Sequence, residues 1–244
     1  MTDNYRDLSD DKKAAVESMF DSIAWRYDFL NHFLSLNIDR LWRRRVIKII
    51  SRSYKSPYIL DVATGTGDLA LAAMKIHPAK ITGIDISGKM LEIGKEKVDK
   101  RGYAGTIDLI PGDSEQIPFN DNIFDVAMVA FGVRNFSDPL KGLSEMTRVI
   151  RKGGMIIVLE FSKPKGYIIK PLYNFYFRNI LPFFGRLFSK DKTAYNYLPE
   201  SVMKFPDNEE FLKLLIQAGC SETHQIKLTG GVASIYTGIK LSMQ

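Results

Sequence analysis

The sequence has a single cysteine and no long apolar run, and each of these absences excludes a class of protein. Because Cys220 has no second cysteine to pair with, an internal disulfide framework is excluded and a reducing compartment is expected. No segment approaches the about 18 uncharged apolar residues of a membrane span, and the polar residues 1–7 do not resemble a secretory signal. We therefore expect a cytoplasmic protein that meets membranes only at its surface.

Histidine is also scarce, and the three histidines, His32, His77 and His224, lack the spacing of metal ligands. We expect no metal site. The sequence has no internal repeat or low-complexity linker, so its 244 residues, 45% of them hydrophobic, fit one α/β domain with an appended helical cap. The net charge of +6 permits an anionic partner, such as a nucleic acid or lipid headgroups, without requiring one.

The most informative stretch is residues 58–69, which predicts a buried strand, a glycine turn and the start of a helix. Gly65, Gly67 and Ala70 fit the G-x-G-x-x-G/A pattern of dinucleotide-binding turns. However, Asp68 follows the second glycine at the helix start, where its carboxylate would repel a pyrophosphate. An acidic turn flanked by Asp61 and Asp68 suits S-adenosylmethionine instead, because that cofactor has an ammonium, a sulfonium and a ribose but no phosphate.

The next strands are expected to bring more polar residues to the same edge of the sheet. Residues 80–85 predict a strand that ends in Asp85, which we expect to bind both ribose hydroxyls. A third strand, residues 107–110, leads to Asp113 and Ser114, which are placed to bind the adenine. The fourth strand, residues 124–130, runs into residues 131–136, where we expect the transferred group to meet its acceptor.

The remaining pattern completes an α/β fold. It predicts a helix at 139–149, a strand at 155–160, a helix at 206–219 capped by Asp207, and two strands at about 222–228 and 232–239 joined at two glycines. We expect a Rossmann-like fold of the class I S-adenosylmethionine-dependent methyltransferases, with a seven-stranded, mostly parallel sheet and a C-terminal antiparallel hairpin strand.

Two segments outside this core have alternative interpretations. Residues 9–50 have helical periodicity; they are either amphipathic helices packed on the sheet, with Arg43 to Arg45 solvated, or an N-terminal cap that closes over a substrate. Residues 167–200 form a helical insertion rich in aromatic residues and spaced cations, which fits a core-facing helix, a lid over an apolar substrate or a face that rests on lipid headgroups. We favour the lid or the membrane face.

Four stretches resemble signatures of one family, the C-methyltransferases of menaquinone and ubiquinone biosynthesis. Residues 27–42 resemble its Y-D-x-M-N-x-x-x-S-x-x-x-H-x-x-W pattern, residues 131–135 match F-G-[LIV]-R-N, residues 148–164 resemble R-V-L-K-P-G-G followed by L-E-F-S-K-P, and residues 195–201 extend the similarity. Three positions depart from the patterns: Leu30 replaces Met, Asp39 replaces His, and Lys152 replaces Pro. Because Asp39 lacks an imidazole, we assign that position no essential role in proton transfer.

The resemblance implies methyl transfer from S-adenosylmethionine to a ring carbon of a prenylated hydroquinone. Demethylmenaquinol, the precursor of menaquinol, is the first candidate, and the ubiquinone precursor 2-polyprenyl-6-methoxy-1,4-benzoquinol is the alternative. The resemblance also implies that Thr66, Asp85, Asp113 and Ser114 contact the cofactor, beside Gly65 and Gly67 of the turn. For the chemistry we predict Arg134, as a permanent cation that favours the phenolate or holds a water, with Asn135 and Tyr27 orienting the ring hydroxyls.

Two other functional classes fit less of the sequence. An RNA or protein methyltransferase on the same fold has only the basic charge in its favour, because the fourth strand ends in Ala130-Phe131-Gly132 and lacks a [DN]-P-P-[YF] loop. A non-catalytic quinone-binding module would not need a complete cofactor site. We therefore expect a lipophilic quinol as substrate, contact with a membrane surface and no nucleic-acid partner, and we leave a homodimer open.

Overall fold

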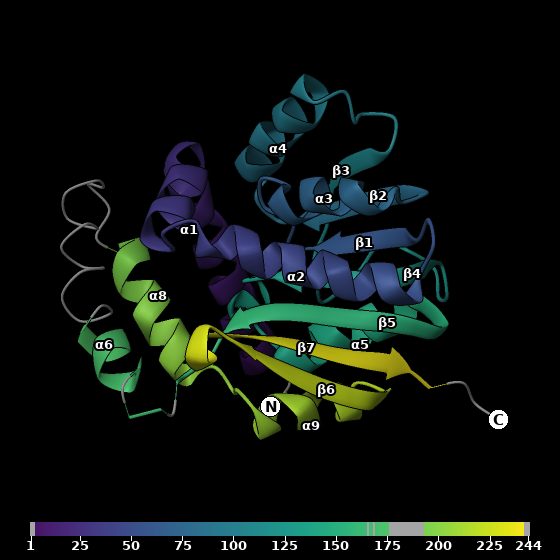
Figure 1. The fold of residues 1–244 in the computed structure, drawn as a ribbon. Coiled ribbons are helices and arrows are strands. Elements are labelled where there is room, and N and C mark those ends of the chain that lie inside the picture. The colour runs from purple at the N-terminus through teal and green to yellow at the C-terminus, as the bar shows by residue number, and fades with distance from the viewer. Residues whose placement is uncertain (1–2, 165, 168, 176–192, 242–244) are drawn as a thin grey trace.

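The computed structural model of the protein describes residues 3–164, 166–167, 169–175 and 193–241. Its centre is a seven-stranded sheet with the strand order β3-β2-β1-β4-β5-β7-β6 (Figure 1). The strands are β1 (Tyr58–Val62), β2 (Lys80–Asp85), β3 (Ile107–Pro111), β4 (Phe124–Ala130), β5 (Ile150–Phe161), β6 (Cys220–Leu228) and β7 (Ala233–Lys240). β1 to β5 pair in parallel, and β7 runs antiparallel to both of its neighbours. The predicted mostly parallel sheet with an antiparallel C-terminal strand is therefore confirmed.

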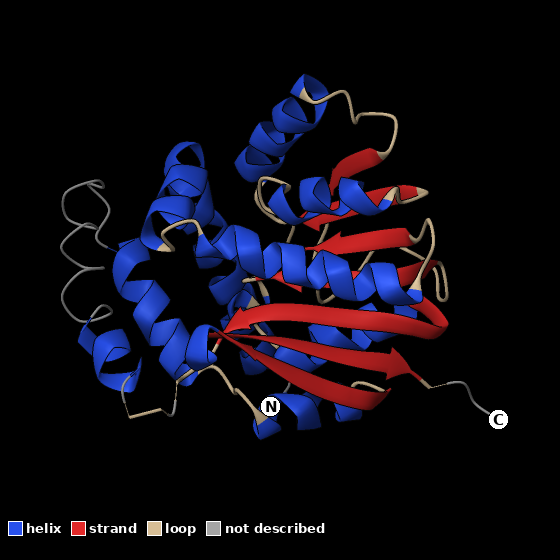
Figure 2. Ribbon diagram, in the orientation of Figure 1, coloured by secondary structure: helices blue, strands red, loops and turns tan. Residues whose placement is uncertain are grey.

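Helices cover both faces of this sheet, which gives three layers (Figure 2). On one face, α2 (Ile38–Ser53), α3 (Asp68–Ala73) and α4 (Gly88–Lys100) share a core with alternate residues of the central strands. On the other face, α5 (Pro139–Val149) and α9 (Glu209–Gln217) share a second core with the remaining residues of the same strands. Because β1 and β4 are buried on both faces, their sequences are almost continuously apolar.

The longest helix, α1 (Asp3–Leu34), lies at the edge of the sheet where the parallel strands end (Figure 1). Its contacts fix this position: Lys13 binds Asp113 beyond β3, Asp21 binds Ser87 beyond β2, and Asp28 binds Thr66 beyond β1. α1 and α2 thus form the region predicted as a cap, 9–50. Of the predicted insertion at 167–200, the structure describes α6 (Ile169–Phe175) and α8 (Thr193–Lys204), whereas residues 176–192 lie outside the described residues.

Short polar signals set several helix boundaries. Ser87 accepts a hydrogen bond from the Met90 amide at the start of α4, and Asp138 accepts one from the Lys141 amide at the start of α5. The predicted cap of α9 at Asp207 is wrong, because Asn208 occupies the cap position. The Asp207 carboxylate instead accepts a hydrogen bond from the Lys163 amide at 2.8 Å, so it joins the end of β5 to α9.

β5 begins five residues before its predicted start at Met155 because two glycines let its first part bend. Gly153 has a φ of +73°, a conformation that side chains disfavour. A Cβ on Gly154 would lie 2.7 Å from the carbonyl oxygen of Arg151 and 2.9 Å from that of Asp125. The pairing with β4 shifts its register at this point, so the strand starts irregularly and continues into its buried part. Among the described residues, no helix is long and apolar enough to cross a membrane.

Candidate active site

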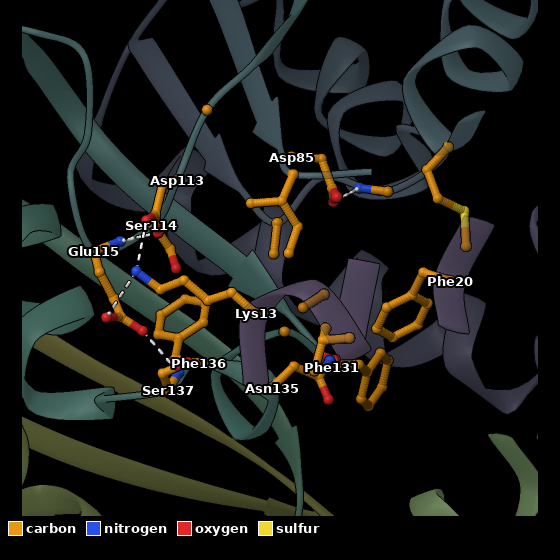
Figure 3. A pocket seen from close by; sticks show the side chains of 18 of the residues that line it. Lys13, Phe20, Asp85, Asp113, Ser114, Glu115, Phe131, Asn135, Phe136 and Ser137 are labelled. Carbon is orange, nitrogen blue, oxygen red and sulfur yellow. Dashed lines mark hydrogen bonds and ion pairs between the residues drawn. The ribbon is translucent and has the colours of Figure 1, made fainter. Parts of the chain in front are cut away.

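A pocket lies beneath α1 where β1 to β4 end, with about 690 Å³ of empty space that is partly open to solvent. Residues from each of these strand ends line it, together with Lys13, Val16, Phe20 and Tyr27 of α1. Figure 3 shows Asp113, Glu115 and Lys13 with the ring of Phe136 on one side of the pocket, and the rings of Phe20 and Phe131 on the other, with Asp85 between them at the top of the view. The site thus combines carboxylates with aromatic rings.

The glycine turn between β1 and α3 is held by two carboxylates. Asp85, at the end of β2, accepts a hydrogen bond of 2.8 Å from the amide of Gly65, which has a φ of +55°. Asp61, in β1, accepts one of 2.7 Å from the Thr64 hydroxyl and one of 3.2 Å from the Ala70 amide. Because Asp61 takes an amide of the first turn of α3, this helix start is poorly suited to a pyrophosphate.

Burial gives Asp61 an unusual protonation state. Its side chain has no access to solvent water, and this raises its pKa from 3.8 to about 7, against the opposing effect of the hydrogen bonds from Thr64 and Ala70. Burial also raises the pKa of Asp85, although the amides of Ser87 and Gly65 oppose the shift. Both acids therefore favour the protonated form more than an exposed aspartate does.

We expect the Asp61→Asn variant to gain stability relative to the natural protein as the pH rises. The unfolded chain ionises Asp61 near pH 4, whereas the folded protein keeps the proton to about pH 7, so the stability contributed by Asp61 is lost across this window. The difference in unfolding free energy should change by about 2–3 kcal/mol between pH 5 and pH 8. Urea unfolding at both pH values measures it, with the exposed Asp108→Asn as control. If the difference in unfolding free energy between the variant and the natural protein did not change with pH, the raised pKa of Asp61 would be wrong.

The loop after β3 carries the other acidic end of the pocket. The Asp113 carboxylate accepts a hydrogen bond from the Glu115 amide, and Lys13 of α1 lies 2.7 Å from Asp113 and 3.2 Å from the Glu115 carboxylate (Figure 3). Glu115 also accepts hydrogen bonds from the amides of Ser137 and Asp138. Ser114 lines the pocket between these two acids. The two acids bind Lys13 jointly, which fixes α1 to this end of the pocket.

A second, smaller pocket with about 340 Å³ of empty space continues past the glycine turn. It shares Tyr27, Ala63, Gly65 and Ala130 with the larger pocket. Its other lining residues are Arg43, Asp61, Thr64, Thr66, Asp68 and Leu69. The two pockets are therefore adjacent.

Thr66 lies in this second pocket and is tied to α1. Its hydroxyl donates to the Asp28 carboxylate at 2.5 Å and accepts from Lys97 at 3.0 Å. Lys97 also contacts Asp28 and Asp68 at 2.7 and 2.5 Å. Burial raises the pKa of Asp68, but Lys97 and Arg43 together outweigh this and hold it below its ordinary value.

Of the residues predicted to act in the chemistry, two line the larger pocket and one lies behind its wall. Tyr27 and Asn135 are lining residues, and burial raises the pKa of Tyr27. The amide oxygen of Asn135 accepts a hydrogen bond of 3.1 Å from Tyr197 of α8. Arg134 is buried, donates to the Phe131 carbonyl and pairs with Glu160 at 3.0 Å. The structure thus brings together Gly65, Asp85, Asp113, Ser114, Tyr27 and Asn135, with Thr66 in the adjoining pocket; their roles stay predictions.

Sequence reasoning missed several charged residues of the site. Lys13, Lys97 and Glu160 lie far from the glycine turn in the sequence, and surface residues of the same types are common along the chain. Only Glu160 carried a signal, because an acid inside an apolar strand is rare without a partner. Within the described part of the chain, no cluster of three or more potential ligands could hold a metal ion.

Comparison with known proteins places this site in a family. The chain is 48% identical over 232 residues to the ubiquinone/menaquinone biosynthesis C-methyltransferase UbiE of Geotalea daltonii, covering 94% of this chain and 98% of that protein. It is 43% identical over 230 residues to the demethylmenaquinone methyltransferase of Bacteroides fragilis, covering 94% of both.

A solved structure supports the fold independently. A SAM-dependent methyltransferase from Aquifex aeolicus superposes with a TM-score of 0.60 at 20% identity, covering 82% of this chain and 89% of that one. This confirms the Rossmann-like architecture predicted from the strand pattern. Residues 7–240 match the model of the ubiE/COQ5 methyltransferase family, and the chain belongs to that family.

Proposed function

We propose that this protein transfers a methyl group from S-adenosylmethionine to a ring carbon of a prenylated hydroquinone, with demethylmenaquinol as its substrate in menaquinone biosynthesis. Family membership makes the protein an S-adenosylmethionine-dependent C-methyltransferase. The observation that carries the substrate class is the composition of the larger pocket, which is lined by carboxylates and by the rings of Phe20, Phe131 and Phe136. These rings offer an apolar, stacking environment to an aromatic acceptor.

The polar residues fit the methyl donor. Asp85, which already orders the turn through Gly65, is placed to bind the ribose hydroxyls, and Asp113 with Ser114 to bind the adenine. Asp61 keeps an α3 amide engaged, which suits a cofactor without a pyrophosphate. Thr66 and Gly65 border the second pocket, toward the methionine part, and Gly67 caps α3 beside them with a φ of +78°. The cofactor supplies an electrophilic methyl group, so the chain's own task is alignment and the handling of one proton.

Tyr27 and Asn135 are proposed to orient the hydroxyls of the quinol. Both line the larger pocket, one from α1 and the other from the 3-10 turn Val133–Asn135. Arg134 lies behind the wall of the larger pocket, and its positive charge is proposed to favour the phenolate form of the quinol. Its positive charge lowers the pKa of Tyr27, against the larger effect of burial, so its field reaches the pocket.

The experiment that tests the function is methyl transfer from labelled S-adenosylmethionine to three acceptors in detergent. These are reduced demethylmenaquinone, the reduced ubiquinone precursor and bulk RNA. We expect label in the menaquinone ring, and the ratio between the two quinones identifies the pathway. Label in RNA alone, or none in any acceptor despite cofactor binding, would refute the proposal.

We also propose that the corner between α1 and α2 rests on a membrane surface, where prenylated quinols reside. Trp25 and Phe29 lie one turn apart on α1 and are 70% and 56% exposed. Leu36 and Leu41, at the turn and on α2, are exposed as well. The exposed cations Arg40 and Arg44 share one face of α2 next to them. Apolar rings beside cations are typical of segments that dock on anionic lipid headgroups.

The double variant Trp25→Ser, Phe29→Ser should bind vesicles containing anionic lipid about tenfold more weakly, because two interfacial aromatic side chains are lost. Vesicle co-sedimentation measures the binding. Ile216→Ser is the matched control, because Ile216 is also exposed, at 57%, but lies on α9 against the other face of the sheet. Equal binding by the two variants would refute this docking surface.

A further inference from the structure

Arg43 is a buried cation beside the glycine turn, and no ligand has been assigned to it so far. It follows Trp42 on α2, and its side chain is only 9% exposed, whereas its neighbours Arg44 and Arg45 are exposed. The interpretation of Arg43 to Arg45 as solvated therefore holds for two of the three residues. A buried guanidinium remains charged and needs partners for its five N–H groups.

Only part of this guanidinium has such partners among the described residues. Its Nη1 donates to the Asp39 carboxylate one turn earlier on α2. Its Nε is buried without a hydrogen-bond partner in the described part of the chain. Its Nη2 lies 3.9 Å from the Asp68 carboxylate, which is beyond hydrogen-bond distance. The edge formed by Nε and Nη2, the edge that arginine presents to a carboxylate in a two-point contact, thus makes no hydrogen bond within the described residues.

Asp68 does not fill this edge because other groups hold it. Its carboxylate lies 2.5 Å from Lys97 and 3.4 Å from the His32 imidazole. Asp39 likewise contacts His32 at 2.9 Å in addition to Arg43. The acids around Arg43 therefore have other partners, and an additional carboxylate can still gain a two-point contact with Arg43.

Arg43 lines the smaller pocket together with Thr66, Asp68 and the turn residue Gly65. The larger pocket, with Asp85 and Asp113, adjoins it across Tyr27 and Gly65. A ligand whose nucleoside occupies the larger pocket would place its other end here. That end of the methyl donor is an amino acid, with one carboxylate and one ammonium, and the smaller pocket contains both a guanidinium and the carboxylate of Asp68.

We propose that Arg43 binds the α-carboxylate of the methionine part of S-adenosylmethionine. Asp39 then acts as a positioning residue that holds Nη1 and turns the Nε–Nη2 edge toward the pocket. This inference rests on the donor assigned under the proposed function, and it adds a residue from α2 to a site otherwise built from the sheet edge and α1. It also links the N-terminal helices to the cofactor.

The test is calorimetric binding of S-adenosylhomocysteine and of its decarboxylated analogue, which lacks only the α-carboxyl group. The natural protein should bind S-adenosylhomocysteine at least tenfold more tightly than the analogue. Arg43→Gln should lose this preference: its affinity for S-adenosylhomocysteine falls at least tenfold, while its affinity for the analogue changes less than twofold. Arg43→Lys, which keeps the charge but not the two-point edge, should lie between them.

Arg45→Gln is the matched control, since Arg45 is exposed on the same helix and should change neither affinity. If the natural protein fails to distinguish the two ligands, the inference is wrong, and this comparison needs no folded variant. If Arg43→Gln weakens both ligands equally, Arg43 only supports the structure and the inference is again wrong. If S-adenosylhomocysteine does not bind the natural protein at all, the donor assignment itself fails, and that outcome is distinct from the other two.

Discussion

Asp85→Asn is expected to weaken the binding of S-adenosylhomocysteine about 100-fold or more. The Asp85 carboxylate accepts hydrogen bonds from the amides of Gly65 and Ser87 and is placed to accept two more from the ribose. Hydrogen bonds to a charged group contribute about 1.5–3 kcal/mol each, so losing two ribose contacts accounts for a factor of that size. The asparagine NH₂ would also face a backbone amide of the turn and push the glycine loop away.

The same substitution should lower the free energy of unfolding by much less than it weakens the free energy of cofactor binding. Burial raises the pKa of Asp85, which means that the folded protein already carries a cost for the charged carboxylate, and asparagine removes that cost. Calorimetry and thermal unfolding of the variant measure the two quantities separately. Asp108→Asn, an exposed change on the neighbouring β3, is the control and should alter neither. A variant that binds normally, or one that loses stability in proportion to affinity, would remove Asp85 from the proposed ribose site.

The sequence predicted most of the fold because the signals that define it are local. β2, β4 and α5 begin and end at the predicted residues, since each combines a strong apolar pattern with a polar cap or a turn at its ends. Asp85 and Asp113 could be placed for a related reason. In a parallel sheet, the residue after each strand necessarily arrives at the same edge.

The charged lining of the site could not be predicted in this way. Arg43 and Arg45 are two positions apart in a run of three arginines, yet one is buried and the other exposed, because α2 turns only Arg43 toward β1. Lys13 reaches Asp113 over a separation of 100 residues. Such pairings depend on how α1 and α2 dock on the sheet, and no local pattern encodes that docking. The departure at Asp39 has a similar explanation, since its carboxylate contacts both His32 and Arg43, and neither contact could be read from the local pattern.

The ion pair of Arg134 and Glu160 permits a test of whether Arg134 only stabilises the fold or also promotes methyl transfer. Arg134→Met should destabilise the protein by about 3–5 kcal/mol, because it leaves the Glu160 carboxylate, which is 0% exposed, buried without its partner. The loss should be larger at pH 8 than at pH 5. Burial already raises the pKa of Glu160 and Arg134 opposes this, so without Arg134 that pKa rises further. Stability gained by holding the proton is then present at low pH and lost as the pH rises.

Adding Glu160→Gln to Arg134→Met removes both charges, so the double variant should recover stability to within about 1–2 kcal/mol of the natural protein. If Arg134 serves only to hold the wall behind Phe131, methyl transfer should recover along with stability. If the charge of Arg134 favours the phenolate, as proposed, turnover of the double variant should stay at least 100-fold below that of the natural protein. It should also rise with pH, because more of the quinol then ionises without Arg134. Denaturant unfolding and a pH profile of turnover on the single and double variants distinguish these results. Recovery of turnover in the double variant would assign Arg134 to the architecture of the pocket and leave Tyr27 and Asn135 to handle the ring hydroxyls.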